Sequence, residues 1–317
     1  MTDQPSHRDD YSDGYAGLPV AYALAPEDGE PLPDPAAVAW KFEAGEYDDD
    51  VPDEISESFD WFFDNVDTAK VTAIVIGGWE SCYDSDNGTI VARLAESADR
   101  LPELRSLFLG AIMPEQAEIS WIQQSDVTPL LAAYPKLERL EVRGGSGLTL
   151  EPVRHESLRV LRFETGGLPA QVVRAVGGSE LPEMEHLELW FGVDEYGGDA
   201  TTGDCASILS GERLPRLRHL GLQNCPFADE LAAAVAGAPI VARLGSLSLS
   251  MGSLGDEGTE ALLSGQPLTH LSRLDVRHHY MSRAMAARLV AALPGVEVLL
   301  DEPHSRDDDW RYVAVSE

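Results

Sequence analysis

The hydrophobic positions of the chain follow one short pattern, L-x-x-L-x-L, which returns along most of its length. The nine copies begin at Val71, Leu104, Leu137, Leu158, Met184, Leu217, Leu244, Leu271 and Val296. The last copy departs from the consensus, because Asp301 fills its final apolar position. Alternating apolar and polar residues over so short a stretch predict a strand with one buried face. Recurrence every 21 to 33 residues predicts a repeat array, in which each unit buries its core against its neighbours.

The repeating unit extends beyond the predicted strand. Phe227, Leu254 and Met281 occupy the same place in three successive copies, so the turn after the strand repeats as well. A glycine-rich turn and a helix rich in Ala and Leu follow each strand. We expect helix N-caps at Asp229, Asp256 and Ser282, because these side chains accept hydrogen bonds from a helix's first N–H groups.

Two units carry a resemblance to a known family. The segments LRHLGLQNCPFADELAAAV (217–235) and LGSLSLSMGSLGDEGTEALL (244–263) resemble leucine-rich repeats of the ribonuclease-inhibitor type. The resemblance implies an α/β solenoid with a curved parallel sheet inside and helices outside. The ninth position of that pattern is usually Asn or Cys; Cys225 matches it, whereas glycine fills most of the other copies.

A second resemblance is narrower. The segments YAGLPV (15–20) and VTAIVIGGW (71–79) resemble an uncharacterised bacterial family of leucine-rich-repeat proteins. Members of that family are often encoded beside radical-SAM and ATP-grasp enzymes. The resemblance implies a non-catalytic partner in a modification system.

The pattern divides the chain into three parts. Residues 1–69 are expected to form an acidic N-terminal arm and cap, residues 70–303 a solenoid of eight to nine units, and residues 304–317 a closing strand. Phe59, Phe62, Phe63 and Val66 fall on one helical face within the cap. We expect this face to cover the first repeat.

Charge and composition narrow the classes of function. With 23 basic and 55 acidic residues, the net charge of −32 disfavours nucleic acids and anionic membranes and favours a basic partner. No apolar run is long enough for a membrane span, and the N-terminus lacks the features of a signal peptide, so we expect a cytoplasmic protein. Cys82, Cys205 and Cys225 are too scattered for a disulfide framework or a structural zinc site and are expected to be free thiols.

Side chains alternate along a strand, so the residues between the pattern positions are expected on the concave face. The central column should run Val75, Phe108, Glu141, Arg162, Glu188, Gly221, Ser248, Asp275 and Leu300. Exposed Trp and Arg are typical of binding hot spots. We therefore predict a face that binds a protein or peptide, formed by Arg139, Glu141, Arg143, Arg162, Glu164, His186, Glu188, Trp190, His219, Gln223, Arg273, Asp275 and Arg277.

Three longer loops leave the same edge of the predicted strand row, at 77–88, 110–126 and 191–204. Loops carry function more often than the scaffold does. Their aromatic residues are predicted to form a rim: Trp79, Tyr83, Trp121, Phe191 and Tyr196.

Other interpretations of the same residues stay open. The alternative to a binding scaffold is a metal-assisted hydrolase at His186, Glu188 and His219, although their spacing already follows from the repeat. A third is a structural subunit that assembles through the N-terminal cap. The scaffold interpretation implies no catalytic residue, no metal and no cofactor. The acidic arm is also long enough to mask the concave face, with its carboxylates against Arg143 and Arg162.

Overall fold

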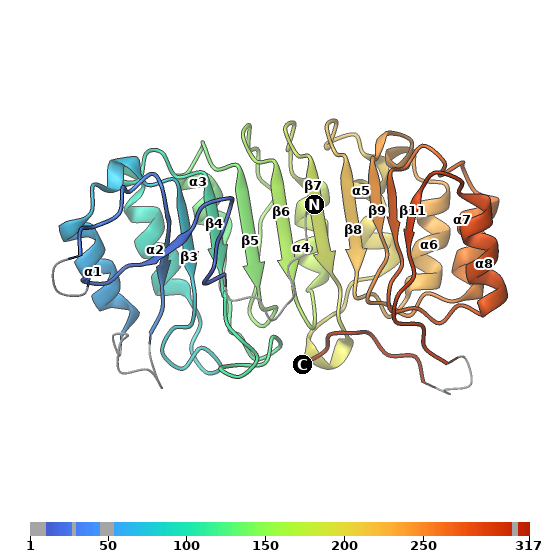
Figure 1. The fold of residues 1–317 in the computed structure, drawn as a ribbon, viewed down its shortest axis with the longest axis horizontal. Coiled ribbons are helices and arrows are strands. Elements are labelled where there is room, and N and C mark those ends of the chain that lie inside the picture. Colours follow the sequence, from blue (N-terminus) through green and yellow to red (C-terminus); the bar gives the residue numbers. More distant parts are fainter. Residues whose placement is uncertain (1–10, 27–29, 45–53, 306–309) are drawn as a thin grey trace. The chain divides into compact units, whose positions relative to one another are not determined.

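A computed structural model describes residues 11–26, 30–44, 54–305 and 310–317 (Figure 1). The chain divides into two compact units, residues 1–149 (the N-terminal unit) and residues 150–317 (the C-terminal unit). Each unit is built from parallel strands that pair in the order in which they occur along the chain, with helices between them.

The strands of the N-terminal unit are β1 (Val20–Tyr22), β2 (Ala39–Phe42), β3 (Ala73–Ile76), β4 (Ser106–Leu109) and β5 (Arg139–Arg143). Its helices are α1 (Ile55–Asn65), α2 (Gly88–Glu96) and α3 (Thr128–Ala133), with short 3₁₀ turns at Thr68–Lys70 and Ala98–Arg100. Val75 pairs with Phe108, and Phe108 with Glu141, so the predicted central column is in register here.

The N-terminal cap differs from the expectation in one respect. Two strands, β1 and β2, precede the first predicted repeat strand and extend the parallel sheet. The apolar face of α1 is buried as predicted, but it packs on β2: Phe59 stacks on Phe42 with ring centroids 4.4 Å apart. The extra strands escaped the sequence pattern because neither carries a full L-x-x-L-x-L motif.

The described part of the C-terminal unit has six strands: β6 (Val160–Glu164), β7 (His186–Trp190), β8 (His219–Gln223), β9 (Ser246–Ser248), β10 (Arg273–Asp275) and β11 (Glu297–Leu299). Its α-helices are α4 (Ala170–Gly178), α5 (Ala206–Ser210), α6 (Ala228–Ala236), α7 (Asp256–Ser264) and α8 (Arg283–Ala292). Three 3₁₀ helices lie at Asp194–Tyr196, Thr202–Cys205 and Pro239–Arg243. Helix α7 packs between α6 and α8. The predicted α/β class, with sequential parallel strands alternating with helices as in a leucine-rich-repeat solenoid, is confirmed.

The last copy is out of step with the prediction. Asp275 of β10 pairs with Leu299 of β11, and not with Leu300. Arg273 pairs with Glu297, and the Arg273 Nε to Glu297 Oε2 distance is 2.8 Å. The expected first position, Val296, lies one residue too late: the register aligns Leu271 with Gly295, so that a glycine fills the first apolar position and Val298 and Leu300 fill the next two.

Helix capping links neighbouring repeats. The Ser282 hydroxyl accepts a hydrogen bond from Met285 N, so it is the predicted N-cap of α8. Asp229 and Asp256 are not the caps of their own helices but lie in the first turn. Each carboxylate accepts instead from the start of the following helix: Asp229 from Gly255 N and Asp256 from Ser282 N, both at 2.7 Å. Each aspartate therefore stabilises the junction between two repeats.

The last eight residues, 310–317, form no strand, in contrast to the expected closing strand. They run along the turns that follow the strands of the C-terminal unit. Tyr312 N donates to Tyr280 Oη (2.9 Å), Ala314 N to Met251 O (2.8 Å) and Val315 N to Asn224 Oδ1 (3.0 Å). The segment is thus held by turns rather than by the edge of β11.

The three cysteines are free and buried, as predicted. Burial raises the pKa of the Cys205 thiol to about 12 and that of Cys225 well above its usual value, so both thiols stay protonated and unreactive. Within the described residues, no helix combines the length and the apolar character needed to cross a membrane.

Candidate functional site

The strand face of the C-terminal unit carries the polar residues that the pattern predicted. The register pairs Arg162 of β6 with Glu188 of β7, and His186 of β7 with His219 of β8. The sequence alignment therefore placed these neighbours correctly. Their side chains converge because equivalent positions of adjacent parallel strands lie side by side.

Glu188 is the centre of this group. Its Oε2 lies 2.8 Å from Arg162 Nε, and its Oε1 lies 2.9 Å from His186 Nε2 and 3.1 Å from His219 Nε2. The two imidazole rings stack, with centroids 4.1 Å apart and planes 16° apart. The opposite side of Arg162 meets Glu164, with Nη1 3.2 Å from Oε1. One carboxylate thus holds a guanidinium and two imidazoles.

The environment sets the protonation of this group. Burial alone would raise the pKa of Glu188, but the Arg162 charge and the contacts with His186 and His219 lower it well below its usual value. Burial lowers the pKa of His186, and the nearby His219 and Arg162 act in the same direction, against the raising effect of Glu188. At neutral pH the carboxylate is therefore ionised and the His186 imidazole is neutral.

Trp190 belongs to a buried hydrogen-bonded row and not to an exposed patch. Its indole Nε1 donates to Gln223 Oε1 (3.0 Å), and Gln223 Nε2 donates to Ser248 Oγ (2.9 Å) and Ser250 Oγ (3.0 Å). Trp190 and Arg162 are both buried, contrary to the exposure expected from their place on the strand face. Neighbouring side chains one strand away are close enough to bury each other, which the linear pattern does not reveal.

The remaining predicted residues of the C-terminal unit lie on β10 and just after it. Asp275 Oδ2 accepts from Arg277 Nη2 at 2.7 Å and Oδ1 from Arg277 Nε at 3.0 Å, a two-pronged contact. Asp275 is buried, whereas Arg277 and Arg273 keep part of their side chains in solvent. Both arginines are therefore partly accessible, as is Glu297, the ion-pair partner of Arg273.

The strand face of the N-terminal unit holds the other three predicted residues. Arg139 Nη1 lies 2.9 Å from Glu141 Oε1, and Glu141 is buried. Arg143 is fully buried: its Nη1 donates to Ile112 O (3.1 Å) and its guanidinium lies over the Phe108 ring, 5.4 Å from the centroid. Of these three residues, Arg139 has the more accessible side chain.

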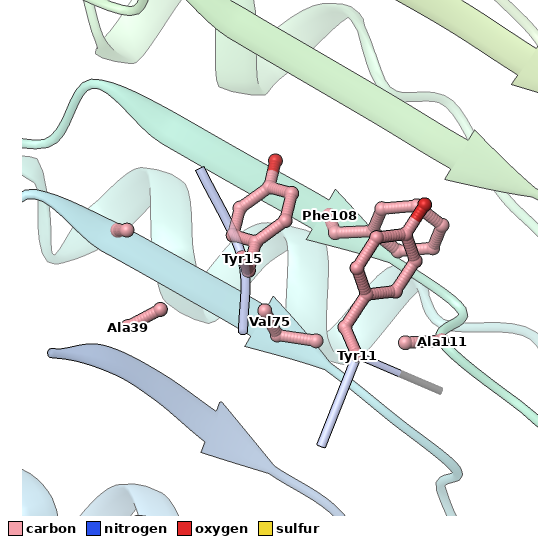
Figure 2. Close-up of a cluster of buried hydrophobic side chains, with 7 residues drawn as sticks. Tyr11, Tyr15, Ala39, Val75, Phe108 and Ala111 are labelled. Atoms are coloured by element: carbon pink, nitrogen blue, oxygen red, sulfur yellow. The ribbon is translucent and has the colours of Figure 1, made fainter. Parts of the chain in front are cut away.

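The first described residues of the chain cover the apolar part of this face. Tyr11 and Tyr15 pack on Val75 and Phe108 in one buried cluster, which Figure 2 shows with Ala39 and Ala111 at its edge. The Tyr11 and Phe108 ring centroids are 4.6 Å apart. In the described part of the arm, tyrosine rings therefore cover apolar residues of the strand face. The acidic residues of 1–10 lie outside the described residues.

The five residues of the predicted aromatic rim differ in their exposure to solvent. Tyr83 and Trp121 are exposed, with 41% and 52% of their surface in solvent. Trp79 and Phe191 are core residues, and Trp79 Nε1 donates to Ser85 O at 2.8 Å. Tyr196 hydrogen-bonds the Glu317 carboxylate near the chain's end.

Sequence reasoning missed the buried amides that hold the loops. In the N-terminal unit, Asn87 Nδ2 donates to Gln124 Oε1 (2.6 Å), and Gln124 Nε2 donates to Arg143 O (2.7 Å). In the C-terminal unit, Asn224 accepts from Val315 N and anchors the last residues. No spacing rule marks such residues, because each amide bonds a side chain or a backbone group that lies far away in sequence.

The comparisons with known proteins give a fold and no function. No model of a known protein family matches the chain, and no curated protein shows significant similarity to it. Among solved structures, the chain is similar to the crystal structure of a Bacteroides fragilis protein determined as a target of the Northeast Structural Genomics Consortium. The two share 28% of their residues with a TM-score of 0.76, over 87% of this chain and 76% of that one. The repeat-like fold of sequential parallel strands is thus shared with a bacterial protein.

Proposed function

We propose that the chain is a non-catalytic scaffold that binds a protein or peptide. The observation that carries this proposal is the pair of exposed aromatic side chains, Tyr83 and Trp121, on two loops of the N-terminal unit. Trp and Tyr contribute most to binding when they project from a rigid surface, because each supplies a large contact area for few rotatable bonds.

The two loops form one connected support. Gln123 N donates to Cys82 O at 2.8 Å, and Gln123 Nε2 lies within hydrogen-bonding distance, 3.3 Å, of both Tyr83 O and Trp121 O. Gln123 therefore links the backbones of the two loops that carry the aromatic rings. Pre-organisation of this kind lowers the entropy cost of binding.

The charge around these rings indicates the class of partner. Asp84, Asp86 and Glu115 are exposed on the same two loops. Together with the net charge of −32, they favour a basic partner, and a Lys or Arg side chain on Trp121 would add a cation–π contact. The accessible strand-face arginines, Arg139 in one unit and Arg273 and Arg277 in the other, are a secondary set of contacts in this proposal.

The resemblances fit the same role. Leucine-rich repeats of the ribonuclease-inhibitor type are protein-binding scaffolds, and the narrower family resembled by residues 15–20 and 71–79 implies a non-catalytic partner in a modification system. Under this proposal the chain presents a substrate or an enzyme in such a system and performs no chemistry itself.

The proposal is tested by affinity capture from the cells that make the protein, with the wild type and a Tyr83→Ala/Trp121→Ala variant as baits. We expect the variant to lose the partner, and we expect added salt to weaken capture, because exposed charges are screened within about 8 Å at physiological ionic strength. Trp310→Ala is the matched control, since Trp310 is exposed to 83% in the other unit.

Equal capture by the wild type and by the Tyr83→Ala/Trp121→Ala variant would reject these two side chains as the binding site. If Arg273→Ala then lost the partner, the strand face would replace it. Capture that survives both changes would favour a structural subunit that assembles through its N-terminal cap. Arg162 and Trp190 are unsuitable for this test, because both are buried and their replacement would disturb folding.

A metal-assisted hydrolase is the second candidate, favoured by the convergence of His186, Glu188 and His219. It requires a metal-dependent hydrolytic activity that His219→Ala abolishes while Tyr83→Ala/Trp121→Ala leaves it intact. Absence of any such activity in the metal-loaded protein would leave the scaffold alone.

A further inference from the structure

Three potential metal ligands meet on the strand face of the C-terminal unit. One donor atom from each of His186, Glu188 and His219 lies within 4.8 Å of the others. The two imidazoles are cross-strand neighbours on β7 and β8, and Glu188 stands two residues after His186 on the same side of β7. The strands fix the Cα positions, so the group is assembled by the fold itself.

One ligand atom lacks a partner of its own. His219 Nε2 is buried and lies 3.1 Å from Glu188 Oε1, but it makes no hydrogen bond within the described part of the chain. His219 Nδ1 is 2.7 Å from Ser246 Oγ. When Nδ1 donates to that hydroxyl, Nε2 presents a lone pair to the carboxylate, and a cation between the two removes their repulsion.

Partners around the group orient it as they do in metal sites. Ser246 holds the outer nitrogen of His219, and Arg162 Nε holds the far oxygen of Glu188 at 2.8 Å. Glu188 is buried, with 3% of its surface exposed, while the His186 side chain is exposed to 32%. The group is therefore closed on one side and open to solvent on the other.

We propose that His186, Glu188 and His219 bind a divalent transition-metal ion, Zn²⁺ by preference, through both Nε2 atoms and Oε1. Two imidazoles and a carboxylate suit zinc and its neighbours, whereas Mg²⁺ and Ca²⁺ prefer oxygen ligands alone. The remaining coordination position faces solvent beside His186. Because the rings stack in parallel, binding turns the half-exposed His186 ring toward the ion.

Two features of the group act in opposite directions on affinity. The Glu188 carboxylate, which lies between the two imidazoles, attracts a cation. The nearby Arg162 charge opposes a cation, and Glu164 partly neutralises it. This site is independent of the proposed partner-binding rim, which lies in the N-terminal unit, so either inference can fail without the other.

The test is a calorimetric titration of Zn²⁺ into metal-free, untagged full-length protein, paired with the visible spectrum of bound Co²⁺. We expect one equivalent of Zn²⁺ for the wild type and a tetrahedral or five-coordinate Co²⁺ spectrum. His186→Ala and His219→Ala each remove a ligand and should abolish stoichiometric binding. Ser246→Ala should weaken binding by about 10- to 100-fold, the usual effect of removing an outer hydrogen bond.

His304→Ala is the matched control, because His304 lies in a separate cluster of histidine and tyrosine rings in the same unit. It should bind Zn²⁺ as the wild type does. Absence of binding by the wild type would overturn the proposal, as would stoichiometric binding that survives His186→Ala or is lost with His304→Ala. His186 is half-exposed, so its variant should fold and decides the question even if His219→Ala does not.

Discussion

The strand face on β3 and β4 of the N-terminal unit and the strand face of the C-terminal unit fill the same repeat positions with side chains of opposite character. In the N-terminal unit the face positions Ala73, Val75 and Phe108 are apolar, and Tyr11 and Tyr15 cover them (Figure 2). In the C-terminal unit the corresponding positions are Arg162, Glu188, Ser248 and Asp275, and they are paired with side chains of their own or neighbouring strands.

The difference shows that the repeat specifies the backbone and leaves the face free to vary. An apolar face gains stability only when another segment removes it from water. A polar face is buried at little cost only when every charge finds a partner. The apolar positions of the N-terminal face are therefore buried by a segment from outside the repeat. The polar positions of the C-terminal face are buried by contacts with side chains of the repeat itself.

The largest effect is expected from Phe108→Ala in the N-terminal unit. Phe108 is fully buried under Tyr11 and Tyr15, so the change removes a large contact and leaves a cavity, with a loss of about 3–5 kcal/mol. Urea unfolding measures it, with Val160→Ala on a half-buried strand-face position as control. A loss below about 1 kcal/mol would mean that the tyrosines do not cover this face in solution.

Glu188→Gln tests the charged face in the same way. It leaves the buried Arg162 with a weaker set of partners, and breaking a buried pair from one side costs about 3 kcal/mol. The triple variant Arg162→Met/Glu164→Gln/Glu188→Leu removes the charges of both ion pairs of Arg162 and should recover most of that loss in the same unfolding experiment. A triple variant as unstable as Glu188→Gln would show that the ion pairs themselves stabilise the fold.

Acidification should weaken the C-terminal unit more than the N-terminal unit. Seven of the eight histidines lie at residue 155 or beyond, and the pKa values of His186, His278 and His279 are lowered chiefly by burial. For a lowered histidine pKa, the unfolded chain takes up its proton first, so stability falls as pH drops below about 6.5.

The measurement is the unfolding free energy between pH 7.5 and 5.5. His186→Gln should flatten part of that slope, because Glu188, whose pKa is also lowered, stays ionised throughout this range and contributes its loss at lower pH. A slope that is the same in the variant would show that His186 does not change its protonation on folding.

The smallest effect is expected from Arg159→Ala. Arg159 Nη2 lies 2.8 Å from Glu185 Oε1, but the two side chains are 49% and 40% exposed, so the pair should contribute less than about 1 kcal/mol. Thermal unfolding of this variant and of Glu188→Gln compares the stability contributed by an exposed and by a buried ion pair, both of which link the segments of β6 and β7. Equal losses of stability in the two variants would show that burial does not determine how much an ion pair contributes.

The alignment of repeats predicted which residues of the site are neighbours across adjacent strands. The neighbours His186 and His219, and Arg162 and Glu188, were placed by counting from the strand anchors, because parallel strands in register bring equal positions together. The prediction for the last copy was wrong by one residue, because a glycine, Gly295, and not an apolar residue occupies its first pattern position. The strands β1 and β2 were missed because they lie in the acidic, proline-rich region and lack the full motif.

The exposure of side chains could not be predicted in this way. Trp79, Trp121 and Trp190 look alike in sequence, but Trp79 bonds Ser85 O, Trp190 bonds Gln223, and Trp121 is half in solvent. The two buried indoles have partners that depend on loop conformation or on another strand. The capping role of Asp229 likewise passes to the next repeat, because Gly255 N lies 2.7 Å from its carboxylate.

The sequence by itself determined the repeat, the order and direction of the strands, the helices between them and the burial of the cysteines, because each follows from local periodicity and composition. Only the tertiary structure decided which face positions are covered, which charges are paired and which aromatic rings meet solvent. Those properties depend on contacts between residues distant in sequence, such as Tyr11 on Phe108 and Asn224 on Val315. The free energy of such contacts is set by burial and hydrogen-bond geometry, which no linear spacing records.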